Sequence, residues 1–125
     1  MKHLSDFTAA DLVELARSDV ARALAEDVGT GDLTAALVDR TRTARARILA
    51  REPAVICGEP WVEAAVLACD PSAQLTWHVG EGQRCATDQV VLEIEGSAQA
   101  LLTAERTALN FLQLLSAVAT KTAVF

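Results

Sequence analysis

The chain has 125 residues, 51% of which are hydrophobic, and a formal net charge of −6, so it is long enough for one globular domain with a modest core. The acidic balance disfavours nucleic acids and anionic membranes as partners. The sequence contains neither an uninterrupted apolar run for a membrane span nor the apolar segment of a secretory signal.

The first predicted element is an amphipathic helix from Thr8 to about Ala25, where apolar residues follow a 3.6-residue period. We expect Gly29 to end this helix, so that residues 26–34 form a turn in which Asp32 caps a short helical turn. Two glycines before a helix start could also hold a phosphate. This alternative is disfavoured because no lysine accompanies the glycines and three nearby carboxylates would repel the phosphate.

Residues 43–51 alternate between small apolar side chains and a row that contains three arginines, which predicts a strand with one buried and one basic face. The basic face could bind phosphate, but we expect a solvated face that pairs with acidic residues. Pro53 interrupts the strand, which resumes at Ala54–Cys57. A helix is then predicted from Pro60 to about Cys69, and Asp70-Pro71 ends it.

Two more alternating segments, Gln74–Val79 and Gln89–Glu95, predict strands on either side of a turn at Gly80–Gly82. His78 falls on the outer face of the first strand, and we interpret a lone histidine there as a surface residue and not as a catalyst. Together these elements predict an α+β domain in which a few antiparallel strands carry helices on one side.

The last quarter of the chain predicts a long helix that starts near Ser97 or Thr103 and is apolar nearly all round. A narrow polar stripe crosses it, formed by Thr103, Arg106, Asn110, Gln113 and Thr120. Such a helix needs burial on most sides, and Arg106 needs an anionic partner because an unpaired buried charge is very costly. We therefore predict an anion-binding site and a missing partner surface, and we divide the chain into a domain of residues 1–102 and a connecting helix of residues 103–125.

The numbers and positions of cysteine and lysine limit the kinds of metal site and catalytic site that the sequence can form. Cys57, Cys69 and Cys85 are widely spaced, form no Cys-x-x-Cys pair and lie at no metal-ligand spacing from a histidine. We interpret them as reduced thiols of a cytoplasmic protein without a structural metal. The lysines are Lys2 and Lys121, near the two ends of the sequence, so neither a phosphate-loop lysine nor a Schiff-base lysine is expected.

Several blocks of sequence resemble the quinolinate phosphoribosyltransferases, also called nicotinate-nucleotide pyrophosphorylases (carboxylating). The blocks are AEDVGTGDLT at residues 25–34, REPAVICG at 51–58, LLTA at 101–104 and ERTALNFLQ at 105–113, the last followed by LSAVAT. They extend over nearly the whole chain in the order and spacing of the family. The ERTALNF string is the most specific of them.

The resemblance implies a fold and a reaction. The N-terminal part of such enzymes is an open, hammerhead-like α/β sandwich, followed by an α/β barrel that carries most of the active site. In the homodimer or higher oligomer, the sandwich of one subunit covers the barrel of the other. The enzymes convert quinolinate and phosphoribosyl pyrophosphate, with Mg²⁺, into nicotinate mononucleotide, pyrophosphate and CO₂ in de novo NAD synthesis.

One residue role carries over to this chain by resemblance. Arg106, in the Glu-Arg-Thr motif, is implied to bind a quinolinate carboxylate in the partner subunit's site, which agrees with the two parallel hydrogen bonds that a guanidinium offers a carboxylate. The alternative is an ion pair within the chain to Glu105 or Glu95. We expect Glu105, Asn110 and Gln113 to position the helix and not to touch the substrate.

The chain also departs from the family. Leu114 stands where many members have a polar residue, and Ala117 replaces a usual glycine, which puts the fine helix packing in doubt. The barrel that follows in the family, with its catalytic residues and metal ligands, is absent from these 125 residues. We therefore expect the chain to be the N-terminal part of the enzyme, to lack activity alone, to bind no metal and to self-associate through an apolar patch.

Three other hypotheses stay open. Residues 77–83 and 89–96 are similar to the hairpins of biotinyl and lipoyl carrier domains, but those domains modify a lysine and none lies between Lys2 and Lys121. A sister phosphoribosyltransferase, acting on nicotinate or on a molybdenum-linked substrate, would share the sandwich-plus-barrel plan. A regulatory subunit that completes another chain's site would look the same in sequence.

Overall fold

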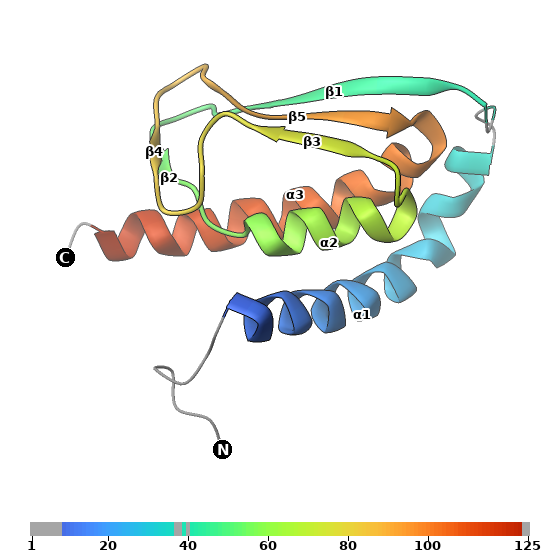
Figure 1. Cartoon of the computed structure of the whole chain (residues 1–125), viewed down its shortest axis with the longest axis horizontal. Coiled ribbons are helices and arrows are strands. Elements are labelled where there is room, and N and C mark those ends of the chain that lie inside the picture. Colours follow the sequence, from blue (N-terminus) through green and yellow to red (C-terminus); the bar gives the residue numbers. More distant parts are fainter. Residues whose placement is uncertain (1–8, 37–38, 40, 124–125) are drawn as a thin grey trace.

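The computed structural model describes residues 9–36, 39 and 41–123, and it describes side chains for 10–26, 39 and 41–123. The elements within these ranges are α1 (Ala9–Ala36), β1 (Thr43–Leu49), β2 (Ala54–Val55), α2 (Glu59–Cys69), β3 (Gln74–Trp77), β4 (Arg84–Cys85), β5 (Val90–Ser97) and α3 (Ala98–Ala123). Figure 1 shows α2 and α3 side by side beneath the larger sheet, with α1 packed below these two helices.

The larger sheet is antiparallel with the strand order β1-β5-β3, and β2 and β4 form a separate two-stranded ladder. The register pairs Thr43 with Ser97 across β1 and β5 and Leu75 with Ile94 across β3 and β5. The prediction of an α+β domain with antiparallel strands and helices on one side is confirmed. The sheets are open, and no barrel occurs among the described residues.

The core lies between the sheet and the pair α2–α3. Leu92 on the central strand is fully buried, and it belongs to one core cluster with Val62 and Ala65 of α2 and Ala104 and Ala108 of α3. The alternation predicted for residues 43–51 is confirmed over β1, where every second residue faces the core. The strands predicted near residues 74–79 and 89–95 and the helix predicted near 60–69 are also present, with ends shifted by a few residues.

One predicted boundary is wrong. Helix α1 runs through Gly29 without a break, so the expected turn at residues 26–34 does not form and Asp32 lies inside the helix instead of capping a new one. A glycine ends a helix only where the chain adopts a left-handed conformation, whereas a helical glycine costs only about 1 kcal/mol relative to alanine. Because no new helix starts after these glycines, the phosphate-binding turn is excluded as well.

Two tryptophans fasten neighbouring elements through their indole N–H groups. Trp61 of α2 donates to Asp19 Oδ2 of α1 at 3.0 Å, and Trp77 of β3 donates to Glu63 Oε1 of α2 at 3.0 Å. Each bond lets a large aromatic ring pack against the core while its polar atom is satisfied. The order of layers in Figure 1 therefore follows from specific contacts and not from apolar burial alone.

Helix α3 is held near its C-terminal end by β2 and by the segment that links β2 to α2. Thr120 Oγ1 accepts a hydrogen bond from the Val55 N–H at 2.8 Å. Ser116 Oγ accepts one from the Cys57 N–H at 3.0 Å and donates one to the Cys57 carbonyl at 3.1 Å. Gly58 has φ 114°, and a Cβ there would lie 3.2 Å from Leu115 Cδ1. The close approach of α3 to this segment therefore favours glycine.

The junction of β5 and α3 is held by Asp70, the residue that follows α2. Its Oδ2 accepts a hydrogen bond from the Ser97 N–H at 2.8 Å, and its Oδ1 accepts from the Ser72 N–H and Oγ–H at 3.0 and 2.7 Å. The Ser97 backbone bond and the two Ser72 bonds favour the carboxylate and lower the pKa of Asp70 below its ordinary value. The N-terminal end of α3 therefore depends on an ionised side chain.

We expect this carboxylate to make folding stability pH-dependent. Because the folded pKa is depressed, its contribution is complete above the ordinary aspartate pKa of about 4 and is lost as the pH falls through the lower folded value. The free energy of unfolding of the wild type should exceed that of Asp70→Asn above pH 5, and the gap should close on acidification, as urea unfolding at several pH values would measure. Asp88→Asn, on an exposed turn, is the control. A gap that stays constant from pH 6 to pH 2.5 would contradict this assignment.

Candidate functional site

Arg106 lies exposed in α3 and makes no ion pair or hydrogen bond with any residue that the structure describes. Neither partner proposed within the chain is engaged with it: Glu95 pairs with Arg45 at 3.3 Å, and Glu105 forms no ion pair with any described residue. Successive residues of a helix point about 100° apart, so Glu105 projects away from its neighbour. The guanidinium of Arg106 is therefore free to bind an anion from outside the domain.

Arg106 belongs to a surface that we call the outer face of α3. Its members recur at spacings of three or four residues, and all are exposed: Leu102, Arg106, Asn110, Gln113 and Ala117. The opposite side of the helix is buried, with Ala104, Thr107, Ala108 and Leu112 each no more than 5% exposed. The helix therefore has one side for its own core and one side that the described part of the domain leaves uncovered.

The polar stripe predicted on this helix divides into two kinds of residue. Its end members bond within the domain: Thr103 Oγ1 donates to the Gln99 carbonyl at 3.2 Å, and Thr120 donates to the Ser116 carbonyl at 2.7 Å and bonds Val55. Its central members, Arg106, Asn110 and Gln113, are exposed. None of these three, nor Glu105, forms a hydrogen bond or ion pair within the described ranges. The expectation that Glu105, Asn110 and Gln113 position the helix is therefore wrong, because the hydrogen bonds that hold α3 in place come from other side chains.

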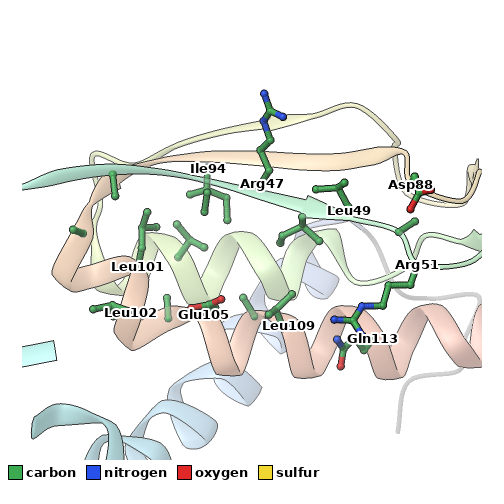
Figure 2. A pocket seen from close by; sticks show the side chains of 18 of the residues that line it. Arg47, Leu49, Arg51, Asp88, Ile94, Leu101, Leu102, Glu105, Leu109 and Gln113 are labelled. Carbon is green, nitrogen blue, oxygen red and sulfur yellow. The ribbon is translucent and has the colours of Figure 1, made fainter. Parts of the chain in front are cut away.

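A groove runs beside the outer face, between α3 and the edge strand β1 (Figure 2). Its larger part holds about 700 Å³, and the residues that line it include Ala44, Ala46, Ala104 and Ala108. A second hollow of about 540 Å³ continues it toward β2, and both hollows are lined by Leu49, Arg51, Leu109 and Gln113. Glu105 lines the first hollow (Figure 2), which places its carboxylate on the groove side of the helix. The sequence prediction did not include this groove.

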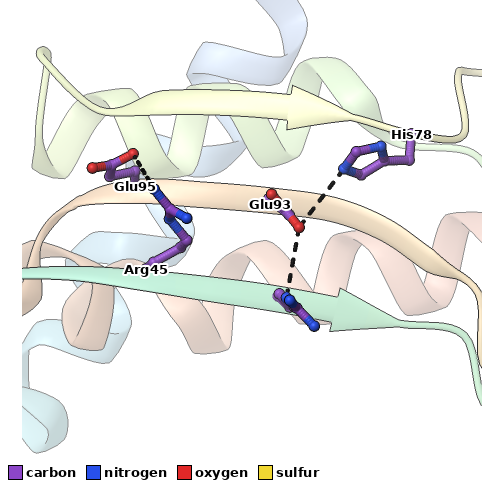
Figure 3. A network of polar contacts seen from close by, with 5 residues as sticks. Arg45, His78, Glu93 and Glu95 are labelled. Atoms are coloured by element: carbon purple, nitrogen blue, oxygen red, sulfur yellow. Dashed lines mark hydrogen bonds and ion pairs between the residues drawn. The ribbon is translucent and has the colours of Figure 1, made fainter.

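The far face of the sheet is an ion-paired surface (Figure 3). Arg45 lies 3.3 Å from Glu95 and Arg47 lies 3.6 Å from Glu93, and the same carboxylate is 3.9 Å from His78 Nε2. All these distances join exposed or half-exposed groups, which contribute little to stability. The interpretation of the arginine row as a solvated, acid-paired face is confirmed for Arg45 and Arg47, whereas Arg51 follows the strand and lines the groove. His78 is exposed as expected.

The three cysteines are free, and burial raises the pKa of Cys57 and of Cys69, with the Glu81 carboxylate adding to the effect at Cys57. These two groups are therefore thiols at neutral pH and poor nucleophiles. Across the described ranges, no three side chains of His, Cys, Asp or Glu converge as a metal site requires. None of the helices in the described part of the chain combines the length and apolar character that a membrane crossing needs.

Comparison with known proteins gives one consistent family. The model of the quinolinate phosphoribosyl transferase N-terminal domain matches residues 32–116. A probable nicotinate-nucleotide pyrophosphorylase (carboxylating) of Bacillus subtilis is 34% identical over 97 residues, which are 78% of this chain and 34% of the relative. A protein of the same description from Synechocystis is 38% identical over 99 residues, 79% of this chain and 34% of the relative. The chain thus spans about a third of the length of the curated relatives it matches.

Solved structures agree with the sequence comparison. The nicotinate-nucleotide pyrophosphorylase of Francisella tularensis superposes with a TM-score of 0.81 at 34% identity, covering 86% of this chain and 39% of that structure. NadC of Streptococcus pyogenes gives a TM-score of 0.77 at 35% identity, with 85% and 39% coverage. In both, the superposed region includes most of the described chain and less than half of the relative.

Proposed function

Because the chain belongs to the quinolinate phosphoribosyltransferase family and matches its N-terminal domain, we propose that it works as that domain in an enzyme of de novo NAD synthesis. The enzyme would transfer phosphoribose from phosphoribosyl pyrophosphate to quinolinate and release nicotinate mononucleotide, pyrophosphate and CO₂. The observation that carries the proposal is the exposed Arg106 within ERTALNFLQ, inside the matched range 32–116, which pairs with no residue that the structure describes.

The role proposed for Arg106 is to bind a carboxylate of quinolinate in the site of a partner subunit. A guanidinium offers two parallel N–H donors that match the two oxygens of a carboxylate, so it fixes the orientation of the pyridine ring as well as adding charge. Its exposure in α3 supports this role, because an arginine used inside the domain would be paired there. Arg106 would therefore orient the substrate. The residues that promote the making and breaking of substrate bonds would be supplied from outside these 125 residues.

Two further parts of the proposal concern what lies around the domain. We place the partner subunit over the outer face of α3, because that face is exposed and carries Leu102, which is 44% exposed, beside Arg106. Mg²⁺ would accompany phosphoribosyl pyrophosphate, but the described residues offer no ligand cluster, so no step is assigned to it on this chain. The free cysteines fit a reducing compartment, and we propose the cytoplasm.

The proposal is tested by completing the domain. We define the assembled enzyme as a chimera in which this chain replaces the matching third of the Bacillus subtilis relative. The purified 125-residue chain should form no nicotinate mononucleotide from quinolinate and phosphoribosyl pyrophosphate, whereas the assembled enzyme should form it, as chromatography of the product would measure. Product formation by the chain alone would refute the proposal that catalysis needs the rest of the enzyme. An assembled enzyme that folds and oligomerises but makes no product would refute the function.

A further inference from the structure

We propose that Asn110 is a second substrate-binding residue of this domain, and that its side-chain amide donates a hydrogen bond to the same carboxylate that Arg106 binds. The inference rests on the proposed function and extends it by one residue. Its starting point is position: the two residues are four apart in α3, which brings their side chains together one above the other on the helix surface. Both are exposed on the outer face.

The direction of the side chains favours a shared ligand. Helical side chains lean toward the N-terminus of the helix, so Asn110 leans over the turn that carries Arg106. A carboxylate has about four lone-pair positions, and the fork of one guanidinium occupies two of them. A neutral amide beside the fork can donate to a third without repelling the arginine. Glu105 does not compete for the same space, because it lines the groove toward β1.

Within the described part of the chain, no structural role is evident for the Asn110 side chain. It forms no hydrogen bond with any described residue, and the bonds that fix α3 come from Ser97, Ser116 and Thr120. Asparagine is also less favourable than alanine in the interior of a helix, so helix stability does not account for it. Asn110 is thus an exposed amide in mid-helix, one turn from a guanidinium that pairs with no described residue, and it is placed to bind the same ligand as that guanidinium.

The test compares Asn110→Ala, Asn110→Asp and Gln74→Ala in the assembled enzyme. Asn110→Ala should raise the KM for quinolinate about tenfold and leave the KM for phosphoribosyl pyrophosphate unchanged, since one hydrogen bond to a charged group is lost. Asn110→Asp should raise it further, because a carboxylate would then face the substrate carboxylate. Gln74→Ala removes an exposed amide of the sheet, away from the outer face of α3, and should change the KM less than twofold.

Each remaining outcome contradicts the inference in a recognisable way. An unchanged KM in Asn110→Ala would show that the amide does not contact the substrate. A wild-type KM in Asn110→Asp would mean that the side-chain oxygen orients Arg106 and that the amide N–H is not used. Arg106→Ala in the same enzyme separates this failure from a failure of the proposed function. If Arg106→Ala is impaired and the Asn110 variants are normal, the second contact alone is wrong; if Arg106→Ala is also normal, the proposed site is wrong.

Discussion

Replacing Arg106 by alanine is expected to lower kcat/KM for quinolinate by about 100- to 1,000-fold in the assembled enzyme. Truncating one partner of a desolvated, hydrogen-bonded charge pair typically costs about 3 to 4 kcal/mol, and each 1.4 kcal/mol corresponds to about a tenfold change. The loss should appear mainly in the KM for quinolinate, because the arginine is proposed to bind the substrate and not to take part in the bond changes. Steady-state kinetics with varied quinolinate would measure it.

Two control variants sharpen this prediction. Arg106→Lys keeps the charge but loses the planar pair of donors, so it should recover only part of the lost affinity. Arg45→Ala removes another exposed arginine, which is paired with Glu95 on the sheet surface, so kcat/KM should change less than about threefold. An Arg106→Ala enzyme with wild-type kcat/KM, or an equal loss in Arg45→Ala, would refute the assignment of the carboxylate site.

Replacing Leu92 by alanine is expected to lower the free energy of unfolding by about 3 to 4 kcal/mol. Leu92 is fully buried on the central strand and faces Ile48 on one neighbouring strand and Trp77 on the other. Removing its side chain leaves a cavity between the sheet and the two helices beneath it, and the strands on both sides restrict collapse into that space. Urea unfolding of the purified chain, followed by far-UV circular dichroism, would measure the loss.

Leu114→Ala is the matched control for Leu92→Ala, because it makes the same chemical change in a side chain that is 65% exposed. It should alter the free energy of unfolding by no more than about 0.5 kcal/mol. Equal losses in the two variants would show that the packing between the sheet and α2–α3 does not dominate stability. If only Leu114→Ala lowers the free energy of unfolding, another molecule covers the side of α3 that carries Leu114 under the conditions used.

The sequence predicted the sheet well because its signals are local. In residues 43–49, apolar and charged side chains alternate with period two, and a half-buried strand has the same period. β4 was missed because two residues, Arg84–Cys85, are too short to show any period. The end of α1 was misplaced because a glycine signals both a helix stop and a tolerated helical position, and the local sequence does not separate the two.

The candidate site was predicted in part, and the reason for the gap is physical. Arg106 was identified from a charged residue in an apolar helix and from a resemblance, but whether it is paired depends on where Glu95 and Glu105 point in three dimensions. The groove was not predictable, because its walls come from β1 and α3, which meet only after the sheet has formed on the helices. Arg51 and Gln113, which line both of its hollows, are distant in sequence.

The two attachments of α3 have a consequence for affinity. The helix is tied at its start by Asp70 to Ser97 and near its end by Cys57 and Val55 to Ser116 and Thr120, with Arg106 between the ties. Because both ends of the helix are fixed, the backbone that carries Arg106 already holds its position before a ligand binds. The conformational entropy cost of positioning the backbone that carries the guanidinium is therefore met during folding. Less of that cost is subtracted from the free energy of ligand binding.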